Sequence, residues 1–149
     1  MRIFGIICLL GALISCGNNK SAKEKQINTE SIEAIATKIE VKKMDFDILI
    51  VYRIDCDEFE NFKNNTMSLY STKNRDTINQ FLNAINELER DSTKHFIDVR
   101  AKLFIFYQNN KIDTLCMNRH LVKINNEFYS NSKRMIGLIE ELSYNEKFD

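Results

Sequence analysis

The chain has 149 residues, with 21 basic and 21 acidic side chains and a formal net charge of zero. No run of lysines and arginines stands out, which disfavours nucleic-acid binding because phosphate neutralisation requires a concentrated positive surface. The chain contains no proline and only four glycines, and three of these fall within the first seventeen residues. Asparagine must therefore supply the left-handed backbone conformations that tight turns need.

The N-terminal residues have the pattern of an export signal. Arg2 gives a minimal positive start, and Ile3 to Ile14 form an almost purely apolar run that only glycines interrupt. This run of twelve residues lies within the roughly 7–15 of a signal-peptide core and is shorter than the roughly 20 needed to span a bilayer. We therefore expect the segment to direct export.

The four residues Leu13-Ile14-Ser15-Cys16 then resemble the lipobox of bacterial lipoproteins, with branched apolar residues, a small residue and a cysteine. The resemblance covers residues 1–16. It implies that residues 1–15 are a removable signal peptide and that the thiol of Cys16 takes a diacylglyceryl group. Because two or more acyl chains hold a protein stably on a membrane, it also implies a lipid-anchored domain in the periplasm or at the cell surface. Whether the inner or the outer membrane holds it stays open.

The mature chain divides into a tether and one domain. Residues 16–30 begin with the lipidated cysteine and continue as a polar stretch rich in lysine, asparagine and serine, which is typical of a flexible tether. Residues 31–149 are long enough for one hydrophobic core, and no internal repeat is present. We expect a single globular domain there.

The first half of the domain is predicted from apolar spacing. Residues 31–41 fit both a helix face and a strand, and we expect a short helix that passes into a strand. Residues 44–54 alternate apolar and other side chains at every second position, which predicts a strand. Residues 55–65 have the spacing of a helical turn, and residues 67–71 suit a short strand.

The second half contains two helices and two hairpins. Residues 74–88 carry an unbroken apolar stripe at the spacing of a helix, which Asn74 or Thr72 can cap, and Ser132 can cap a second helix. Residues 96–107 and 111–117 form a predicted hairpin around Asn109-Asn110, and a two-residue turn there places Phe104 opposite Leu115. Residues 121–129 form a shorter hairpin around Asn125-Asn126. The order predicts an α+β fold, an antiparallel sheet of about four to six strands with two main helices packed on one face.

Two cysteines fall in the predicted domain. By strand parity Cys56 and Cys116 both point toward the core. An exported chain can keep a disulfide, so this pair is either a disulfide or two buried free thiols, and the sequence does not decide between them.

A second apolar surface is predicted on the sheet face away from the helices. Its members are Leu49, Val51, Phe104, Phe106, Leu115 and Met117. Large exposed apolar patches on monomers are uncommon and usually mark a contact. We expect residues 31–41 to cover this patch, and a partner protein or a second copy of the chain is the alternative.

Charged clusters offer weaker candidates. One strand face is predicted to carry Asp98, Arg100 and Lys102, and the hairpin register places Asp113 and Arg119 close to them. Such a group can bind an anion or assist acid–base chemistry. It is more often the solvated side of a sheet. The acidic stretch at residues 55–60 lacks the glycine and spacing of a calcium loop, and the two histidines lack zinc-site spacing. We therefore expect no metal, no cofactor and no catalytic motif.

These observations favour an accessory or inhibitory lipoprotein that binds another protein of the cell envelope. In this interpretation Cys16 anchors the chain to the membrane, and the second apolar surface contacts the partner. The alternative is a small-ligand binder or an enzyme using Asp98, Arg100 and Arg119. That alternative requires a concave pocket in which these three side chains lie close together.

Overall fold

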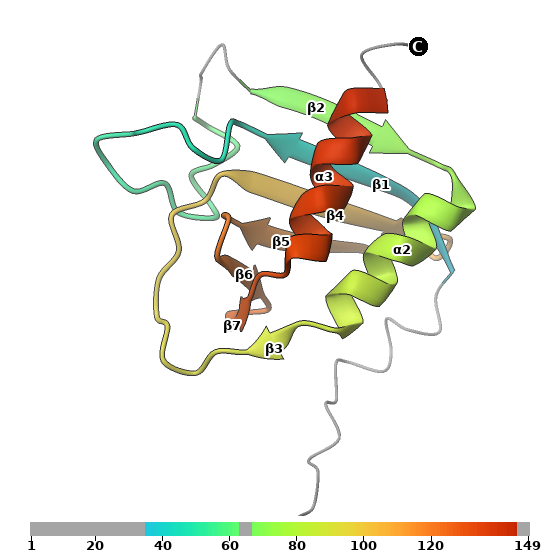
Figure 1. Cartoon of the computed structure of the whole chain (residues 1–149). Helices are drawn as coiled ribbons and strands as arrows, with labels where there is room; N and C mark the ends of the chain where they lie inside the picture. Colours follow the sequence, from blue (N-terminus) through green and yellow to red (C-terminus); the bar gives the residue numbers. More distant parts are fainter. Residues whose placement is uncertain (1–34, 63–66, 146–149) are drawn as a thin grey trace, which may run out of the picture.

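The computed structural model describes residues 35–62 and 67–145, so the predicted signal peptide and tether lie outside the described residues. The described elements are β1 (Ala36–Lys43), β2 (Ser68–Thr72), α2 (Arg75–Asn86), β3 (Glu89–Arg90), β4 (Ala101–Tyr107), β5 (Ile112–Met117), β6 (Leu121–Ile124), β7 (Glu127–Ser130) and α3 (Lys133–Asn145). All strands pair antiparallel in one seven-stranded sheet of order β2-β1-β4-β5-β6-β7-β3 (Figure 1). The predicted α+β class is confirmed, with more strands than the four to six expected.

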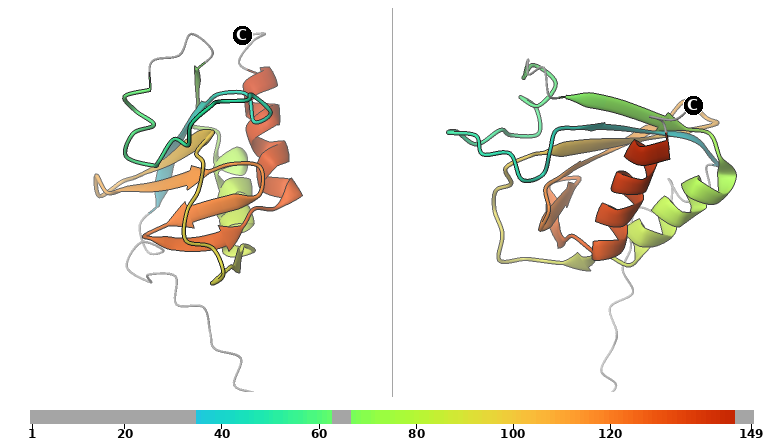
Figure 2. Two further views of the ribbon diagram at one scale, coloured as in Figure 1. Left: turned by 90° about the vertical axis from the view of Figure 1, so that its left-hand side faces the viewer. Right: turned by 45° about the horizontal axis from the view of Figure 1, so that its top comes forward.

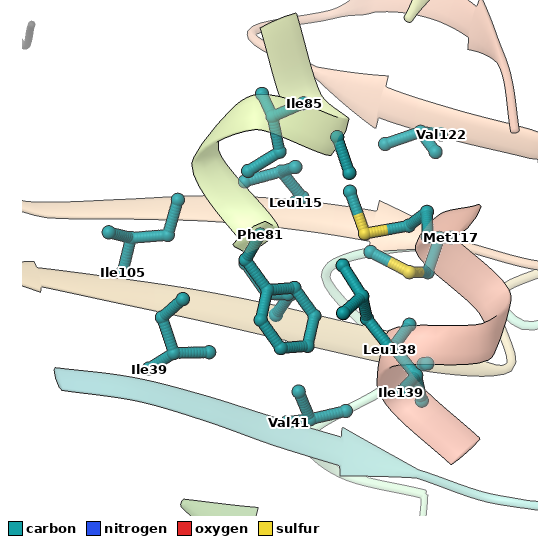
Figure 3. Packing of buried hydrophobic residues seen from close by; sticks show 14 of the residues in the cluster. Ile39, Val41, Phe81, Ile85, Ile105, Leu115, Met117, Val122, Leu138 and Ile139 are labelled. Atoms are coloured by element: carbon teal, nitrogen blue, oxygen red, sulfur yellow. The ribbon is translucent and has the colours of Figure 1, made fainter. Parts of the chain in front are cut away.

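Both helices pack on the same face of the sheet, as the right-hand view in Figure 2 makes clear. The apolar stripe of α2 supplies Ile78, Phe81 and Ile85 to the core, and α3 supplies Met135 and Ile139, among others. Figure 3 shows Phe81 between the helices and the strands, above Ile39 and Val41 of β1. Because Phe81, Val41 and Ile139 are all fully buried, this layer is the main hydrophobic core.

Polar caps fix the starts of both helices. The Asn74 side chain accepts hydrogen bonds from the backbone N–H groups of Asp76 and Thr77, and the Ser132 hydroxyl accepts one from Met135 N at 3.0 Å. These acceptors satisfy N–H groups that have no partner within the helix. The predicted helix at 74–88 is confirmed but ends at Asn86, and residues 89–90 form the short strand β3, which the sequence did not predict.

Asparagine does provide the left-handed turn residues. Among the described residues, the non-glycine positions with positive φ are Asn110 at 63°, Asn125 at 49° and Asn126 at 65°. The last two form the two-residue turn between β6 and β7, with Ile124 paired to Glu127. The predicted second hairpin is thus confirmed, because two successive positive φ angles match the twist of such a hairpin.

The register predicted for the first hairpin is wrong by one residue. Leu103 pairs with Leu115 and Phe106 with Ile112, because the turn contains three residues, 108–110, closed by the Tyr107 N to Lys111 O hydrogen bond of 3.0 Å. A slip of one residue moves every side chain of a strand to the other face. Leu115 and Met117 therefore lie in the main core, and Cys116 points to the opposite face.

The predicted strand at residues 44–54 is also wrong, since this segment is a loop. The place beside β4 is taken by β1, whose residues Ile39 and Val41 pair with Ile105 and Leu103. The predicted helix does not extend into the described residues, where the chain from Ala36 onward is strand, and residues 31–34 lie outside them. A helical turn follows the loop as expected, with Phe59 N donating to Asp55 O at 3.1 Å.

A second hydrophobic cluster covers part of the sheet face away from the helices. It contains Met44, Ile54, Phe59, Ile97, Val99 and Cys116, all at most 3% exposed. The cover over this face therefore comes from residues 44–62 and 96–99. Of the predicted cover, residues 35–41 contribute no side chain to this cluster, and residues 31–34 lie outside the described residues.

Candidate functional site

Residues 45–53 form a closed loop that projects from one end of the sheet, and we call this segment the Ω-loop (Figures 1 and 2). The chain enters it at Met44, whose N–H donates to Arg100 O at 2.9 Å. It leaves at Ile54, whose carbonyl accepts from Val99 N at 2.8 Å. Both ends therefore attach to the same short stretch, residues 98–100, which is the arrangement of a compact loop with a narrow neck.

An ion pair reinforces this neck. Asp98 Oδ1 and Oδ2 accept from Arg100 Nη1 and Nη2, each at 2.6 Å, and Asp98 Oδ1 also accepts from Ile54 N at 3.0 Å. The Arg100 side chain is only 8% exposed. Because a nearly buried guanidinium needs a charged, hydrogen-bonded partner, Asp98 and Arg100 have a structural role in closing the Ω-loop.

The N-terminal side of the Ω-loop is held by the β5–β6 turn. Arg119 donates to the Asp47 carboxylate from Nε at 3.1 Å and from Nη2 at 2.7 Å. The Asp47 N–H donates in turn to Asp45 Oδ1 at 2.9 Å, which fixes a tight turn at the start of the loop. The Arg119 guanidinium also lies over the Phe46 ring, 5.9 Å from its centre.

The chain after the Ω-loop is fixed to the sheet by a disulfide and by ion pairs. Cys56 and Cys116 are joined, with their Cα atoms 5.8 Å apart, so the turn at 55–62 is linked to β5. Glu60 bonds Lys42 Nζ at 2.9 Å and lies 3.4 Å from Lys102 Nζ. Burial alone would raise the pKa of Glu60, but the hydrogen bond from Lys42 and the charges of both lysines outweigh it and lower the pKa.

The tip of the Ω-loop is apolar and exposed. Leu49 is 97% exposed and Val51 is 103% exposed, the highest values among the large apolar residues of the described segments. Tyr52 is 61% exposed and meets the Phe62 ring edge-on, with 6.1 Å between ring centres. The anchored loop thus displays two aliphatic side chains that the domain leaves uncovered.

The predicted apolar patch is divided among three places. Leu49 and Val51 lie at the loop tip, whereas Leu115 and Met117 are buried under the helices and cannot contribute to a surface. Phe104 and Phe106 do face away from the helices, but both are half-buried, and Lys38 Nζ lies 4.1 Å above the Phe106 ring. One feature of the sequence argued against the predicted strand at residues 44–54, since Asp45 and Asp47 are of a residue type that strands disfavour.

A cleft of about 320 Å³ lies between the Ω-loop and the sheet, and Asp98, Arg100 and Arg119 all line it. The small-ligand alternative required these three residues in a concave pocket, and they are indeed together. Their charges, however, are already paired, with Asp98 on Arg100 and Asp47 on Arg119. Of the other predicted members, Lys102 bonds Glu60, and Asp113 lies on the helix-facing side, where it accepts from the Tyr107 hydroxyl at 2.9 Å.

A second hollow of about 250 Å³ lies beside Cys56 and contains His95, Lys123 and Asp57. Within residues 35–62 and 67–145, no three side chains of metal-binding type lie close enough to hold an ion.

Over the same residues, no helix has the length and apolar character needed to cross a membrane. Neither the protein families, nor the curated proteins, nor the solved structures compared with this chain provide a match.

Proposed function

We propose that this protein is a lipid-anchored protein of the bacterial cell envelope whose domain binds another protein as an accessory or inhibitory module. Two features support the proposal. The sequence Leu13-Ile14-Ser15-Cys16 resembles a lipobox and assigns the anchor to Cys16. The Ω-loop supplies a contact surface on the domain.

The single observation that carries the proposal is the full exposure of Leu49 and Val51 on a loop with fixed ends. Exposed aliphatic side chains gain free energy when a partner removes them from water, at about 25 cal/mol per Å² of apolar surface. Ordering a flexible loop would offset that gain. Here the neck, the Arg119 pair and the disulfide restrict the loop before binding, which lowers the entropic cost of association.

The anchor is tested by Cys16→Ser. In the wild type we expect a mature protein in the membrane fraction, with a mass that includes the acyl chains. The variant should accumulate as unprocessed precursor because the residue that takes the diacylglyceryl group is gone. Normal processing and localisation of Cys16→Ser would overturn the lipoprotein assignment.

The contact surface is tested by crosslinking in the living cell with a benzophenone side chain introduced at position 52. We expect a discrete protein adduct that is lost in the double variant Leu49→Ser/Val51→Ser. The matched control is Leu69→Ser, which changes an exposed aliphatic residue on β2 that is 62% exposed and should retain the adduct. If the double variant keeps the adduct, the Ω-loop is not the interface.

A small-ligand function is the second candidate, and the cleft holding Asp98, Arg100 and Arg119 favours it. A ligand carboxylate could replace Asp47 on Arg119, whose side chain is 42% exposed. Arg119→Gln would then abolish ligand-dependent thermal stabilisation, whereas Leu49→Ser/Val51→Ser would not. Unchanged stabilisation in Arg119→Gln would eliminate this candidate.

A further inference from the structure

The Ω-loop lies at the opposite end of β1 from the point where the N-terminal chain joins the domain. β1 begins at Ala36, next to the predicted tether, and ends at Lys43, immediately before the loop. Figure 1 shows the strand running from the right side of the sheet to the loop at the left. The first described residues of the domain and the loop that displays Leu49 and Val51 therefore lie at opposite ends of a strand of eight residues.

The loop region is also strongly acidic within a chain of zero net charge. Residues 44–62 contain six acidic side chains and one basic one, Arg53. Salt bridges occupy Asp47, Asp55 and Glu60. Asp45 and Glu58 are exposed and have no ion pair within the described residues. Arg119, Arg53 and Lys42 thus neutralise three of the carboxylates, whereas the unpaired Asp45 and Glu58 flank the apolar tip on both sides along the chain.

These features distinguish a protein partner from a lipid surface. Anionic lipids attract segments that carry lysine and arginine, by about 1 kcal/mol for each such residue, and repel acidic ones. A loop flanked by two unpaired carboxylates is therefore poorly suited to enter a bilayer that contains anionic lipids. Two fully exposed aliphatic side chains are instead suited to an apolar pocket in a partner protein.

Resting on the proposed function, we propose that the Ω-loop docks into a partner protein by placing Leu49 and Val51 in an apolar pocket bordered by lysine or arginine side chains. The aliphatic contacts provide the burial at the centre of the interface. The charges at Asp45 and Glu58 guide the encounter and fix the orientation, since rim charges act mainly on association rate and on its salt dependence.

The test uses the full lipidated protein in isolated envelope membranes, with the benzophenone at position 52 as the probe. The variant Asp45→Asn/Glu58→Gln removes two charges and keeps the side-chain oxygens that accept hydrogen bonds from Asp47 N and Asp55 N. We expect its yield of protein adduct to fall about three- to tenfold at low salt and to lose the salt dependence of the wild type. The control Glu140→Gln/Glu141→Gln removes two exposed charges from α3 and should behave as the wild type.

The outcomes separate this inference from the proposed function. In one outcome, the adduct depends on Leu49 and Val51 and yet keeps its yield and salt dependence in Asp45→Asn/Glu58→Gln. That result would refute the lysine or arginine residues proposed around the partner's pocket and leave the proposed function standing. Absence of any adduct dependent on Leu49 and Val51 would overturn both. The lipidated protein reconstituted in vesicles of phosphatidylethanolamine and phosphatidylglycerol should form no lipid adduct, and a lipid adduct as abundant as the protein adduct would overturn the choice of a protein partner.

Discussion

The disulfide between Cys56 and Cys116 should contribute most of its stabilisation through the unfolded chain. The two residues are 60 positions apart, so the bond closes a long loop when the protein is unfolded. Loop-closure entropy for a loop of this size corresponds to about 4 kcal/mol at 25 °C. Reduction should lower the free energy of unfolding by about that amount, because both thiols can stay in place in the folded state.

The assay is urea unfolding of the mature protein with and without reductant. For a urea dependence of about 2 kcal/mol per molar, a loss of about 4 kcal/mol moves the midpoint down by about 2 M. The double variant Cys56→Ala/Cys116→Ala is the control, and reductant should leave its midpoint unchanged. The main core contains neither cysteine, so the reduced protein should still show the circular dichroism of both helices.

A difference below about 1 kcal/mol between oxidised and reduced protein would refute this reasoning. It would mean either that the bond does not form in the cell or that the unfolded chain is already compact. Mass spectrometry of the alkylated protein separates these two explanations, because only a free thiol takes the label. Trypsin supplies an independent measurement, and reduction should accelerate its cleavage after Arg53, at the C-terminal end of the Ω-loop.

Three further variants test other parts of the structure. Phe81→Ala removes a ring that is fully buried and should cost about 3–5 kcal/mol in urea unfolding, whereas Leu69→Ala on the surface should cost far less. Asp98→Ala leaves the guanidinium of Arg100 without its partner, and we expect a loss of about 2–3 kcal/mol together with faster cleavage after Arg53. Burial, strengthened by the hydrogen bond to Asp113, raises the pKa of Tyr107 above the ordinary value of 10.0. The phenol therefore contributes stability that is complete below pH 10 and is lost as the pH rises above it, so the wild type should lose stability relative to Tyr107→Phe in unfolding measured above that pH.

The parts of the fold that the sequence predicted correctly depend on local chemistry. The helices follow from apolar residues at helical spacing and from the caps Asn74 and Ser132, which act within one turn. The hairpin at Asn125-Asn126 follows from two adjacent residues that tolerate positive φ. In each case the residues that decide the structure are neighbours in the sequence.

The incorrect predictions concern contacts between residues far apart in the sequence and a turn that is one residue longer than predicted. Asn109-Asn110 suits both a two-residue and a three-residue turn, and the structure has the longer one, with positive φ only at Asn110 among these two. That one residue exchanged the faces of Leu115 and Cys116. The apolar pattern of the first strand does not distinguish the two registers, because residues 103–107 are apolar or aromatic on both faces.

The neck of the Ω-loop could not be predicted either. Asp98 and Ile54 are 44 residues apart and meet through a backbone N–H, and such a contact leaves no pattern in a single sequence. The sequence did identify Asp98, Arg100 and Arg119 as a charged group. Their observed pairing gives this group a structural explanation, whereas the sequence had suggested a catalytic or ligand-binding alternative.

The incorrect strand prediction at residues 44–54 is informative because burial does alternate along most of this segment. Phe46 and Ile54 are buried, Ile48 and Ile50 are partly buried, and every odd-numbered residue from 45 to 53 is exposed. Alternation therefore indicated correctly which of these side chains face the protein, except at Tyr52, which is 61% exposed. It carried no information about whether a neighbouring strand was available for hydrogen bonding. In an extended segment that pairs with no strand, outward positions are most often polar, as Asp45, Asp47 and Arg53 are. Leu49 and Val51 depart from that pattern although both are fully exposed and no packing within the domain requires an aliphatic side chain there. The contact with a partner that we propose would account for them.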